Sequence, residues 1–320
     1  MKAAVVEAAG KRPVYTEFER PAPLAGHRIV DVTASALSHV ARSKASGSHY
    51  SSASAFPFVA GLDGVGRDEN GRRVYFFWPP SPYGALAEQC RVPDANCVAL
   101  PDSIDDVSAA AIAIPGMSSW AALVERAKFV AGETVLINGA TGTSGRLAVQ
   151  IARHLGAGKI IVTGRDAAVL AELQQAGADV TISLTQNADA LSRAFEAQFR
   201  ETVDVVLDYV WGESARVMLI AAARTLDEHQ PLRFVQIGAI GGAELSLPAT
   251  VLRAAPISML GSGIGSIPAA QILEAMQRVL AVAASAGFRI EAHAVPLAQI
   301  GEHWDTFSSR QRTVFVPQGV

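Results

Sequence analysis

The chain has 320 residues, of which 50% are hydrophobic and 18% are charged, and its formal net charge is −3. This length favours two domains that each bury a core. The slightly negative net charge gives no indication of a basic surface that would bind nucleic acid or an anionic membrane. No apolar run approaches the ~18 residues that a membrane span needs. Glu7 also interrupts the apolar core that a signal peptide would need, so we expect a cytoplasmic globular protein.

The two cysteines, Cys90 and Cys97, do not suggest a metal site or a disulfide framework. A structural zinc site normally takes four Cys or His ligands, and disulfides are rare in a reducing compartment. We expect two free thiols in a strand region.

Residues 1 to about 112 are expected to be mostly strand and loop. The clearest strand is 28–36, where small and apolar side chains recur at every second position from Val30 onward, the period of a strand with one buried face. A serine-rich loop follows at 43–54. The other elements expected here are strands at 2–7, 63–66, 73–77 and 85–92, and a helix that starts at Ser108 and is interrupted at Pro115 and Gly116.

From about 118 to 263, apolar strands alternate with helical periodicity, which is the pattern of a doubly wound parallel sheet. The expected strands are 135–137, 160–162, 180–182, 203–207, 232–237 and 257–260, with helices beginning near 147, 169 and 191. Ligands of such sheets lie beyond the carboxyl ends of the strands. The residues expected at that edge are Gly164, Arg165, Gly238, Ala239, Gly261 and Ser262.

The most informative motif follows the first of these strands. Gly139, Gly142 and Gly145 are spaced by three residues and lie between an apolar strand and an amphipathic helix. In such a unit one glycine makes the tight turn, one lets backbone N–H groups approach a pyrophosphate, and one lets helix and strand pack closely. The sequence therefore predicts a dinucleotide site whose turn contains Gly139, Thr141, Gly142, Thr143, Ser144 and Gly145.

Residues 264–320 have no evident place in the six-stranded sheet, and we expect them to return to the first domain. They contain an amphipathic helix at 272–283, a strand near 288–292, a helix near 297–307 and a strand at 313–316. The expected domains are therefore 1–117, 118–263 and a returning segment, 264–320.

Six segments, in their order and spacing, resemble the medium-chain dehydrogenase/reductase superfamily, in particular its zinc-free quinone oxidoreductase branch. They are 61–66, 83–88, 115–123, the glycine turn, 203–208 and 312–317. The resemblance runs nearly end to end. It implies an α/β fold with a Rossmann domain between the two parts of a β-rich, GroES-like catalytic domain. It also implies an NADPH-dependent enzyme that transfers hydride to a quinone or an α,β-unsaturated carbonyl.

The expected chemistry depends on where the chain departs from the zinc alcohol dehydrogenases of that superfamily. Those enzymes place a cysteine where Ser38 stands and a histidine where Leu62 stands, and their four-cysteine loop is absent here. We therefore expect no metal, and we interpret His39 and His49 as surface or supporting groups. An alkoxide is hard to stabilise without a Lewis acid, whereas the conjugation of a quinone or enone spreads the developing charge.

The cofactor is indicated at the end of the second strand of the sheet. NAD-binding members carry an acid there, whose carboxylate accepts the ribose hydroxyls. Here the position is Gly164, followed by Arg165, so that repulsion toward a 2′-phosphate is absent and a bidentate partner is present. The alternative is a solvated arginine beside Asp166 at a helix start. We expect NADPH.

By the resemblance, Ser38 and Tyr50 lie beside the nicotinamide, and Ser118 lies in the cofactor cleft. Tyr50 is the expected proton donor because a neutral phenol can donate without an altered pKa; the alternative is that bulk water protonates the product. The resemblance also implies a homodimer paired along the edge strand at 257–260.

Two other functions remain open. An enoyl-thioester reductase of the same fold would need a basic patch for a phosphopantetheine or coenzyme A tail, and the 43–54 region offers only Arg42 and Lys44. A cofactor-binding protein without turnover, such as a redox sensor, would carry the same glycine turn. A short-chain dehydrogenase is excluded because no tyrosine is followed four residues later by lysine.

Overall fold

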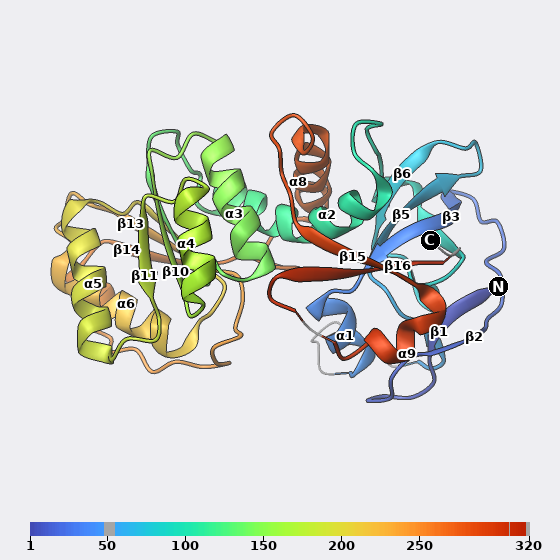
Figure 1. The fold of residues 1–320 in the computed structure, drawn as a ribbon, viewed down its shortest axis with the longest axis horizontal. Coiled ribbons are helices and arrows are strands. Elements are labelled where there is room, and N and C mark those ends of the chain that lie inside the picture. The colour runs from blue at the N-terminus through green and yellow to red at the C-terminus, as the bar shows by residue number, and fades with distance from the viewer. Residues whose placement is uncertain (48–54, 307, 318–320) are drawn as a thin grey trace. The chain divides into compact units, whose positions relative to one another are not determined.

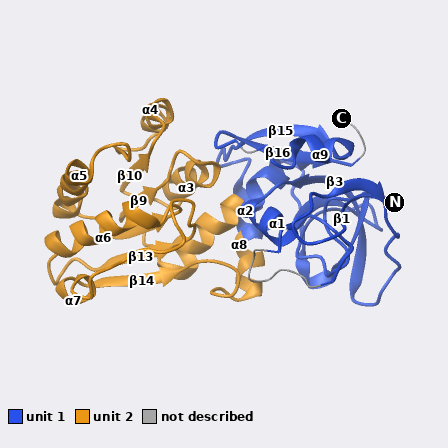
Figure 2. Ribbon diagram, turned by 90° about the horizontal axis from the view of Figure 1, so that it is seen from below, with its two compact units in different colours: residues 1–114, 276–320 blue, residues 115–275 orange. Residues whose placement is uncertain are grey.

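The computed structural model describes residues 1–47, 55–306 and 308–317. The chain divides into two compact units (Figure 2): unit 1 contains residues 1–114 and 276–320, and unit 2 contains residues 115–275. Residues 264–275, which were expected to belong to the returning segment, therefore lie in unit 2.

Unit 2 is built on a six-stranded parallel sheet with the strand order β11-β10-β9-β12-β13-β14. Figure 1 labels β10, β11, β13 and β14 of this sheet. The first strand in the chain, β9, is central, and the chain extends the sheet from it first to one side and then to the other, as in dinucleotide-binding sheets. The predicted doubly wound sheet is confirmed. The bounds are Thr134–Asn138 (β9), Lys159–Gly164 (β10), Val180–Ser183 (β11), Val205–Asp208 (β12), Leu232–Gln236 (β13) and Ile257–Gly261 (β14).

The helices of unit 2 connect these strands. They are α3 (Thr143–His154), α4 (Ala167–Gln175), α5 (Ala188–Glu201), α6 (Gly212–Thr225) and the single turn α7 (Val251–Ala254). Sequence periodicity predicts α3, α4 and α5 but not α6. Half of the 14 positions of α6 are buried, and only Glu213 and Arg224 are exposed, so its polar face is too narrow to give a clear helical period.

Unit 1 contains two sheets among its described residues. One has the order β2-β1-β4; the other has the order β15-β16-β3-β5-β6-β8, and β7 also pairs with β3. Strand β16 pairs with β3 in antiparallel register, with Val314 opposite Ala36. The closing strand therefore extends a sheet begun by the first part of the chain.

The elements of unit 1 include short ones that the sequence pattern does not predict, such as β2, β4 and β8. The strands are Lys2–Val6 (β1), Val14–Glu17 (β2), His27–Ala36 (β3), Phe58–Val59 (β4), Asp63–Asp68 (β5), Arg73–Phe77 (β6), Gln89–Pro93 (β7), Cys97–Ala99 (β8), Glu291–Pro296 (β15) and Gln311–Val316 (β16). The helices are α1 (His39–Ala45), α9 (Ile300–His303) and the 3₁₀ turns Asp94–Asn96 and Leu297–Gln299. Both cysteines are free thiols, as expected.

Two helices, α2 (Asp106–Ala121) and α8 (Ala269–Val282), contain the residues at which the chain passes from one unit to the other. The expected interruption of α2 at Pro115 and Gly116 is wrong: the helix continues through Pro115 and ends in a π-helical turn, Ala122–Arg126. Residues 106–126 are also long and apolar enough to cross a membrane, which corrects the statement that no such run exists. About two thirds of this stretch is buried within the protein, as in the core helix of a soluble protein.

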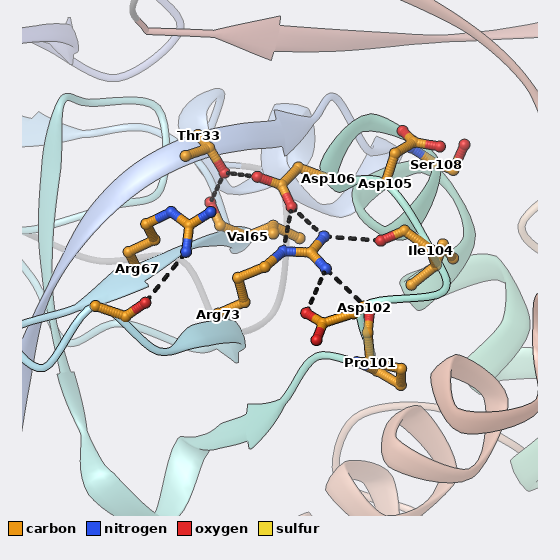
Figure 3. A network of polar contacts seen from close by, with 11 residues as sticks. Thr33, Val65, Arg67, Arg73, Pro101, Asp102, Ile104, Asp105, Asp106 and Ser108 are labelled. Atoms are coloured by element: carbon orange, nitrogen blue, oxygen red, sulfur yellow. Dashed lines mark hydrogen bonds and ion pairs between the residues drawn. The ribbon is translucent and has the colours of Figure 1, made fainter.

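A polar network holds the start of α2 against the strands of unit 1 (Figure 3). The guanidinium group of Arg73 donates to the Asp106 carboxylate from Nε at 3.1 Å and to the Ile104 carbonyl from Nη2 at 2.7 Å. The Thr33 hydroxyl on β3 donates to the other oxygen of Asp106 at 2.6 Å. Multidentate arginine contacts of this kind fix a helix end by geometry as well as by charge.

Candidate cofactor site and active site

The turn between β9 and α3 requires its glycines for different reasons. Gly139 has φ of +88°, a conformation that L-residues with a side chain rarely adopt, and a Cβ atom at Gly145 would lie 2.5 Å from the Cα of Ala140. A Cβ atom at Gly142 would meet only ordinary contact, 3.6 Å from the Gly139 carbonyl. The backbone conformation at Gly139 and the close packing at Gly145 thus require glycine, whereas the protein's own packing does not require glycine at position 142.

The start of α3 is suited to an anion. Gly142 is the N-cap residue and supplies no side-chain hydrogen bond, and the half-buried Thr143 and Ser144 form the first turn. The N–H groups of a first helical turn have no intrahelical partner, and the helix dipole adds partial positive charge there. This arrangement fits the pyrophosphate of a dinucleotide.

A buried side-chain network ties the ends of three strands together below the turn. The Thr163 hydroxyl on β10 donates to Asn138 Oδ1 on β9 at 2.6 Å, and Asn138 Nδ2 donates to Asp208 Oδ1 on β12 at 2.8 Å. The N–H of Gly139 in turn donates to the Thr163 hydroxyl at 3.1 Å. All three side chains are fully buried. The network therefore fixes the position of the glycine turn relative to β10 and β12.

Sequence reasoning does not find this network, although Asp208 stands at the end of an expected strand. Asp208 also accepts from the N–H groups of Val210 and Trp211, both at 3.0 Å. Burial raises the pKa of Asp208, and these donors act in the opposite direction. Polar residues near the ends of neighbouring buried strands are the signal available in the sequence.

Ser118 lies beside Tyr209, the residue that follows β12. The hydroxyls of Ser118 and Ser119 both donate to the Pro115 carbonyl at 2.9 Å, and Ser119 Oγ lies 2.7 Å from Tyr209 Oη. Burial raises the pKa of Tyr209 to about 12, and the two serine hydroxyls oppose the rise. The predicted Ser118 is thus connected to the carboxyl end of β12, the edge at which the glycine turn also lies.

At the end of β10, close packing leaves no room for an acidic side chain at position 164. A Cβ atom at Gly164 would lie 2.1 Å from Thr141 Cγ2, so Thr141 occupies the space that a side chain at 164 would need. Arg165 is exposed, and among the residues that the structure describes it has no ion pair. Asp166 caps α4 by accepting from the N–H groups of Ala168 and Val169.

The remaining predicted cofactor residues lie at the ends of β13 and β14. The N–H of Gly238 donates to the Asp208 carbonyl at 3.1 Å, and Ala239 beside it is exposed. Gly261 accepts from Arg126 Nε at 2.7 Å, and the N–H of Ser262 donates to the Gln236 carbonyl at 2.8 Å. The parallel sheet therefore brings the predicted cofactor residues of β9, β10, β13 and β14 to one edge.

Of the two catalytic residues predicted in unit 1, the structure describes Ser38 but not Tyr50. Ser38 is buried and is the N-cap of α1, where its hydroxyl oxygen accepts from the N–H of Ala41 at 3.0 Å. Tyr50, and with it His49, lies outside the described residues. Leu62 is buried and apolar. Among the described residues, no group of three or more His, Cys, Asp and Glu side chains could hold a metal ion.

Next to Leu62 lies a buried ionisable cluster that sequence reasoning misses. The Tyr75 hydroxyl donates to Asp63 Oδ2 at 3.0 Å, while Asp63 Oδ1 and the Nε and Nη2 atoms of Arg312 are buried without a hydrogen-bond partner among the described residues. Burial raises the pKa of the Asp63 carboxyl to about 7, against the opposing effects of Arg312 and the Tyr75 hydrogen bond. Burial likewise lowers the pKa of the Arg312 guanidinium.

This raised pKa predicts a pH dependence of stability. The folded protein keeps a proton on Asp63 between about pH 4 and 7, where the unfolded chain has lost it. The contribution of Asp63 to the free energy of unfolding is therefore greatest below about pH 4 and falls by at most about 1.4 kcal/mol per pH unit as the pH rises toward 7. Denaturant unfolding of wild type and Asp63→Asn across this range measures it. A wild-type-minus-variant difference that stays constant across this range would mean that Asp63 is ionised in the fold.

Comparisons with known proteins agree with this geometry. The family model described as zinc-binding dehydrogenase matches residues 145–282. A probable NADPH-dependent quinone reductase, tdiC, from Emericella nidulans is 29% identical and is aligned over 95% of this chain and 96% of its own length. A quinone oxidoreductase from Pseudomonas syringae is 25% identical with a TM-score of 0.81, covering 99% of both chains. The quinone oxidoreductase of Thermus thermophilus, whose structure was also determined with NADPH, shares the fold at 23% identity and a TM-score of 0.80, covering 99% of this chain and 100% of its own.

The fold and the glycine turn, together with these relatives, define an oxidoreductase with a dinucleotide-binding unit. The family model, the relatives and the solved structures together support a similarity of the chain to the medium-chain dehydrogenase/reductase superfamily and, within it, to the quinone oxidoreductases.

Proposed function

We propose that the chain is an NADPH-dependent oxidoreductase that transfers hydride to a quinone or an α,β-unsaturated carbonyl without zinc. The observation that carries this proposal is the carboxyl edge of β9 and β10, where a glycine turn capped by α3 lies beside Gly164 and Arg165. The full-length relative named as an NADPH-dependent quinone reductase supports the same cofactor. When bound, NADPH supplies the hydride.

The residues of unit 2 bind and orient the cofactor in this proposal. The N–H groups at the start of α3 hold the pyrophosphate, and Arg165 pairs with the 2′-phosphate. The space beside Gly164 is filled by Thr141 rather than by an acid, so no carboxylate repels that phosphate from position 164. Ser118, Gly238, Ala239, Gly261 and Ser262 line the remainder of the cofactor site.

The residues of unit 1 orient the acceptor. Hydride transfer requires the acceptor carbon within about 3–3.5 Å of the nicotinamide, so positioning supplies much of the rate. Ser38 and Tyr50 are proposed to lie beside the acceptor, with Tyr50 as the donor to the oxygen that gains charge. The hydroxyl oxygen of Ser38 accepts a capping hydrogen bond, which leaves its O–H able to donate. Tyr50 is preferred because its side chain is longer and can also stack on a flat acceptor.

Zinc independence is a prediction of the Ser38 and Leu62 positions, which lack the superfamily's thiolate and imidazole ligands. Metal analysis of the purified protein is expected to give far less than one zinc ion per chain, and chelators are expected to leave activity intact. Stoichiometric zinc that survives dialysis would show that other residues ligate it.

The acceptor class is tested by NADPH consumption with 1,4-benzoquinone, 9,10-phenanthrenequinone, simple enones and a crotonyl thioester. Turnover of quinones or enones supports the proposal, and turnover of the thioester alone would indicate the enoyl-thioester reductase instead. Binding of NADPH without oxidation by any acceptor would indicate a redox sensor.

A homodimer is predicted from strand β14. It ends the strand order of the parallel sheet, and Met259 on it is 36% exposed, so a monomer would present an unpaired edge. An isologous pairing of two β14 strands would cover this edge. Light scattering is expected to give about twice the 33.5 kDa of one chain. A value near one chain at micromolar concentration would contradict the prediction.

We propose a cytoplasmic location, in keeping with two free thiols.

A further inference from the structure

Lys44 in the last turn of α1 is half-buried, and its ammonium group has no ion pair or hydrogen bond among the residues that the structure describes. The chain has five lysines. Three of the others form an ion pair with a glutamate, namely Lys2, Lys128 and Lys159, and Lys11 is exposed. A lysine is rarely buried without a partner, because it is costly to remove an ammonium group from water. Within the described chain, Lys44 thus lacks a counter-charge.

Lys44 lines a pocket of about 60 Å³ in unit 1. Ala41, one helical turn earlier on the same face of α1, lines it as well. A second wall consists of β4 and the residues that follow it, up to Leu62, and is apolar. Burial in this pocket lowers the pKa of the Lys44 ammonium group, and no described acidic side chain opposes that effect. The charge of Lys44 is therefore placed against apolar surface.

The apolar wall is held in place by backbone hydrogen bonds. The Ala60 carbonyl accepts from the N–H of Leu86 at 2.9 Å, and the Leu62 carbonyl accepts from the N–H of Trp78 at 2.8 Å. A Cβ atom at Gly61 would lie 2.6 Å from the Leu86 nitrogen, so the two backbone segments pack directly on each other. The wall is therefore preformed, as is usual for ligand sites, and these two carbonyls already have donors.

The polar side chains of the pocket are able to donate. Besides Lys44, they are Ser81 and Tyr83, whose hydroxyls can each donate a hydrogen bond, and none of the lining residues is acidic. An ammonium group is a strong donor to anionic oxygen atoms, because the hydrogen bond is assisted by charge. The lining therefore matches a ligand that combines anionic oxygen atoms with a hydrocarbon part.

The volume of the pocket limits the size of that ligand. A water molecule needs ~10–15 Å³ measured in this way, so the pocket has room for roughly four small groups. Sites for larger organic molecules have volumes of about 300–1,000 Å³, and the pocket is too small for a quinone ring. A carboxylate with a chain of one or two carbons fits it. An inorganic oxyanion of the same size would leave the apolar wall without a partner.

We propose that this pocket binds a short-chain carboxylate, with Lys44 as the counter-ion. The carboxylate oxygens accept from the ammonium group, and the hydrocarbon chain packs against the wall that follows β4. The bound ligand connects the last turn of α1 to that wall. Because Ser38 caps the start of the same helix, an occupied pocket stabilises the helix that Ser38 begins. A ligand that binds only the folded chain also raises its stability.

Titration of the full chain with propionate tests the proposal without turnover. Saturating NADP⁺ keeps the start of α3 unavailable to the probe. Propionamide is the matched probe, since it has a similar shape and no charge. We expect propionate to bind roughly 10- to 100-fold more tightly than propionamide, the factor that a hydrogen bond to a charged partner contributes. Pivalate, with three methyl groups beside the carboxylate, is expected to bind about tenfold more weakly than propionate because of the small volume.

Variants of Lys44 connect the binding to the pocket. Lys44→Met keeps an unbranched side chain and removes the charge, so propionate is expected to bind roughly 10- to 100-fold more weakly and propionamide equally well. This variant is expected to be at least as stable as wild type without ligand, because it removes an unpaired ammonium group from an apolar pocket. Lys44→Arg keeps the charge and is expected to retain the preference for propionate over propionamide.

Lys11→Met is the matched control, since Lys11 is exposed in the same unit and does not line the pocket. Thermal unfolding adds a second readout: propionate at about ten times its Kd is expected to raise the Tm of wild type and of Lys11→Met but not that of Lys44→Met. Equal affinities of wild type for propionate and propionamide would overturn the proposal. So would an unaltered propionate affinity in Lys44→Met, or an equal loss in Lys11→Met.

Discussion

Tyr50→Phe is expected to lower kcat for enone reduction ~10- to 1000-fold, by analogy with the loss of one oxyanion-hole donor. The substitution keeps the ring, which can stack on a flat acceptor, and removes only the hydroxyl that would donate to the oxygen gaining charge. NADPH affinity is expected to stay unchanged because the cofactor is bound by unit 2. Steady-state kcat with an enone and the Kd of NADPH are the two measurements. Tyr50 lies outside the described residues, and the expectation comes from the resemblance.

Two further variants make this experiment specific. Tyr15→Phe removes a tyrosine hydroxyl from β2 in the same unit and is expected to leave kcat unaltered. Ser38→Ala tests the alternative donor, but it also removes the cap of α1, which costs about 1 kcal/mol, so its stability must be measured alongside its rate. An unaltered kcat in Tyr50→Phe would assign the proton donation to bulk water or to Ser38.

Arg165→Ala is expected to weaken NADPH binding roughly 10- to 100-fold, since a charge-assisted contact is worth about 1.5–3 kcal/mol. NADH lacks the 2′-phosphate, so its binding should be nearly unchanged. Titration of both cofactors measures the two constants. The contrast between them, rather than either constant alone, identifies a contact to the phosphate.

The matched control for Arg165 is Arg193→Ala, which removes an exposed arginine from α5 of the same unit. It is expected to leave both affinities in place. Equal losses for NADPH and NADH in Arg165→Ala, or no loss for either, would remove Arg165 from the cofactor site. NADPH would then have to be recognised by other residues at the carboxyl edge of the sheet.

Much of unit 2 can be predicted from the sequence because its strands and its glycine turn are each specified by a short stretch of residues. A buried parallel strand is a short apolar run, and the glycine turn connects two such elements within about 30 residues. The pairing of Asn138 with Thr163 and Asp208 cannot be predicted in the same way, because it depends on which strands become neighbours. The helix α6 escapes prediction since a helix buried on most sides loses its polar period.

Unit 1 is less predictable because its strands are short and pair across long sequence separations. The proline in α2 illustrates the limit of a local rule: Pro115 removes one backbone donor, yet the helix continues and the Ser118 and Ser119 hydroxyls bond to the Pro115 carbonyl. The cavity that Lys11 and Arg42 line in unit 1 gives no sequence signal, because only the fold brings these two residues together. The same holds for Asp63 and Arg312, which are distant in the chain and adjacent in the structure.

Hydride transfer from NADPH to a conjugated carbonyl acceptor is the activity on which the other proposals depend. It is measured by supplying 9,10-phenanthrenequinone with NADPH, and separately with NADH, and counting the cofactor oxidised against the quinone reduced. We expect one NADPH oxidised for each quinone reduced, with a higher kcat/KM for NADPH than for NADH. Cofactor that binds without being oxidised, or a higher kcat/KM for NADH, would contradict this assignment.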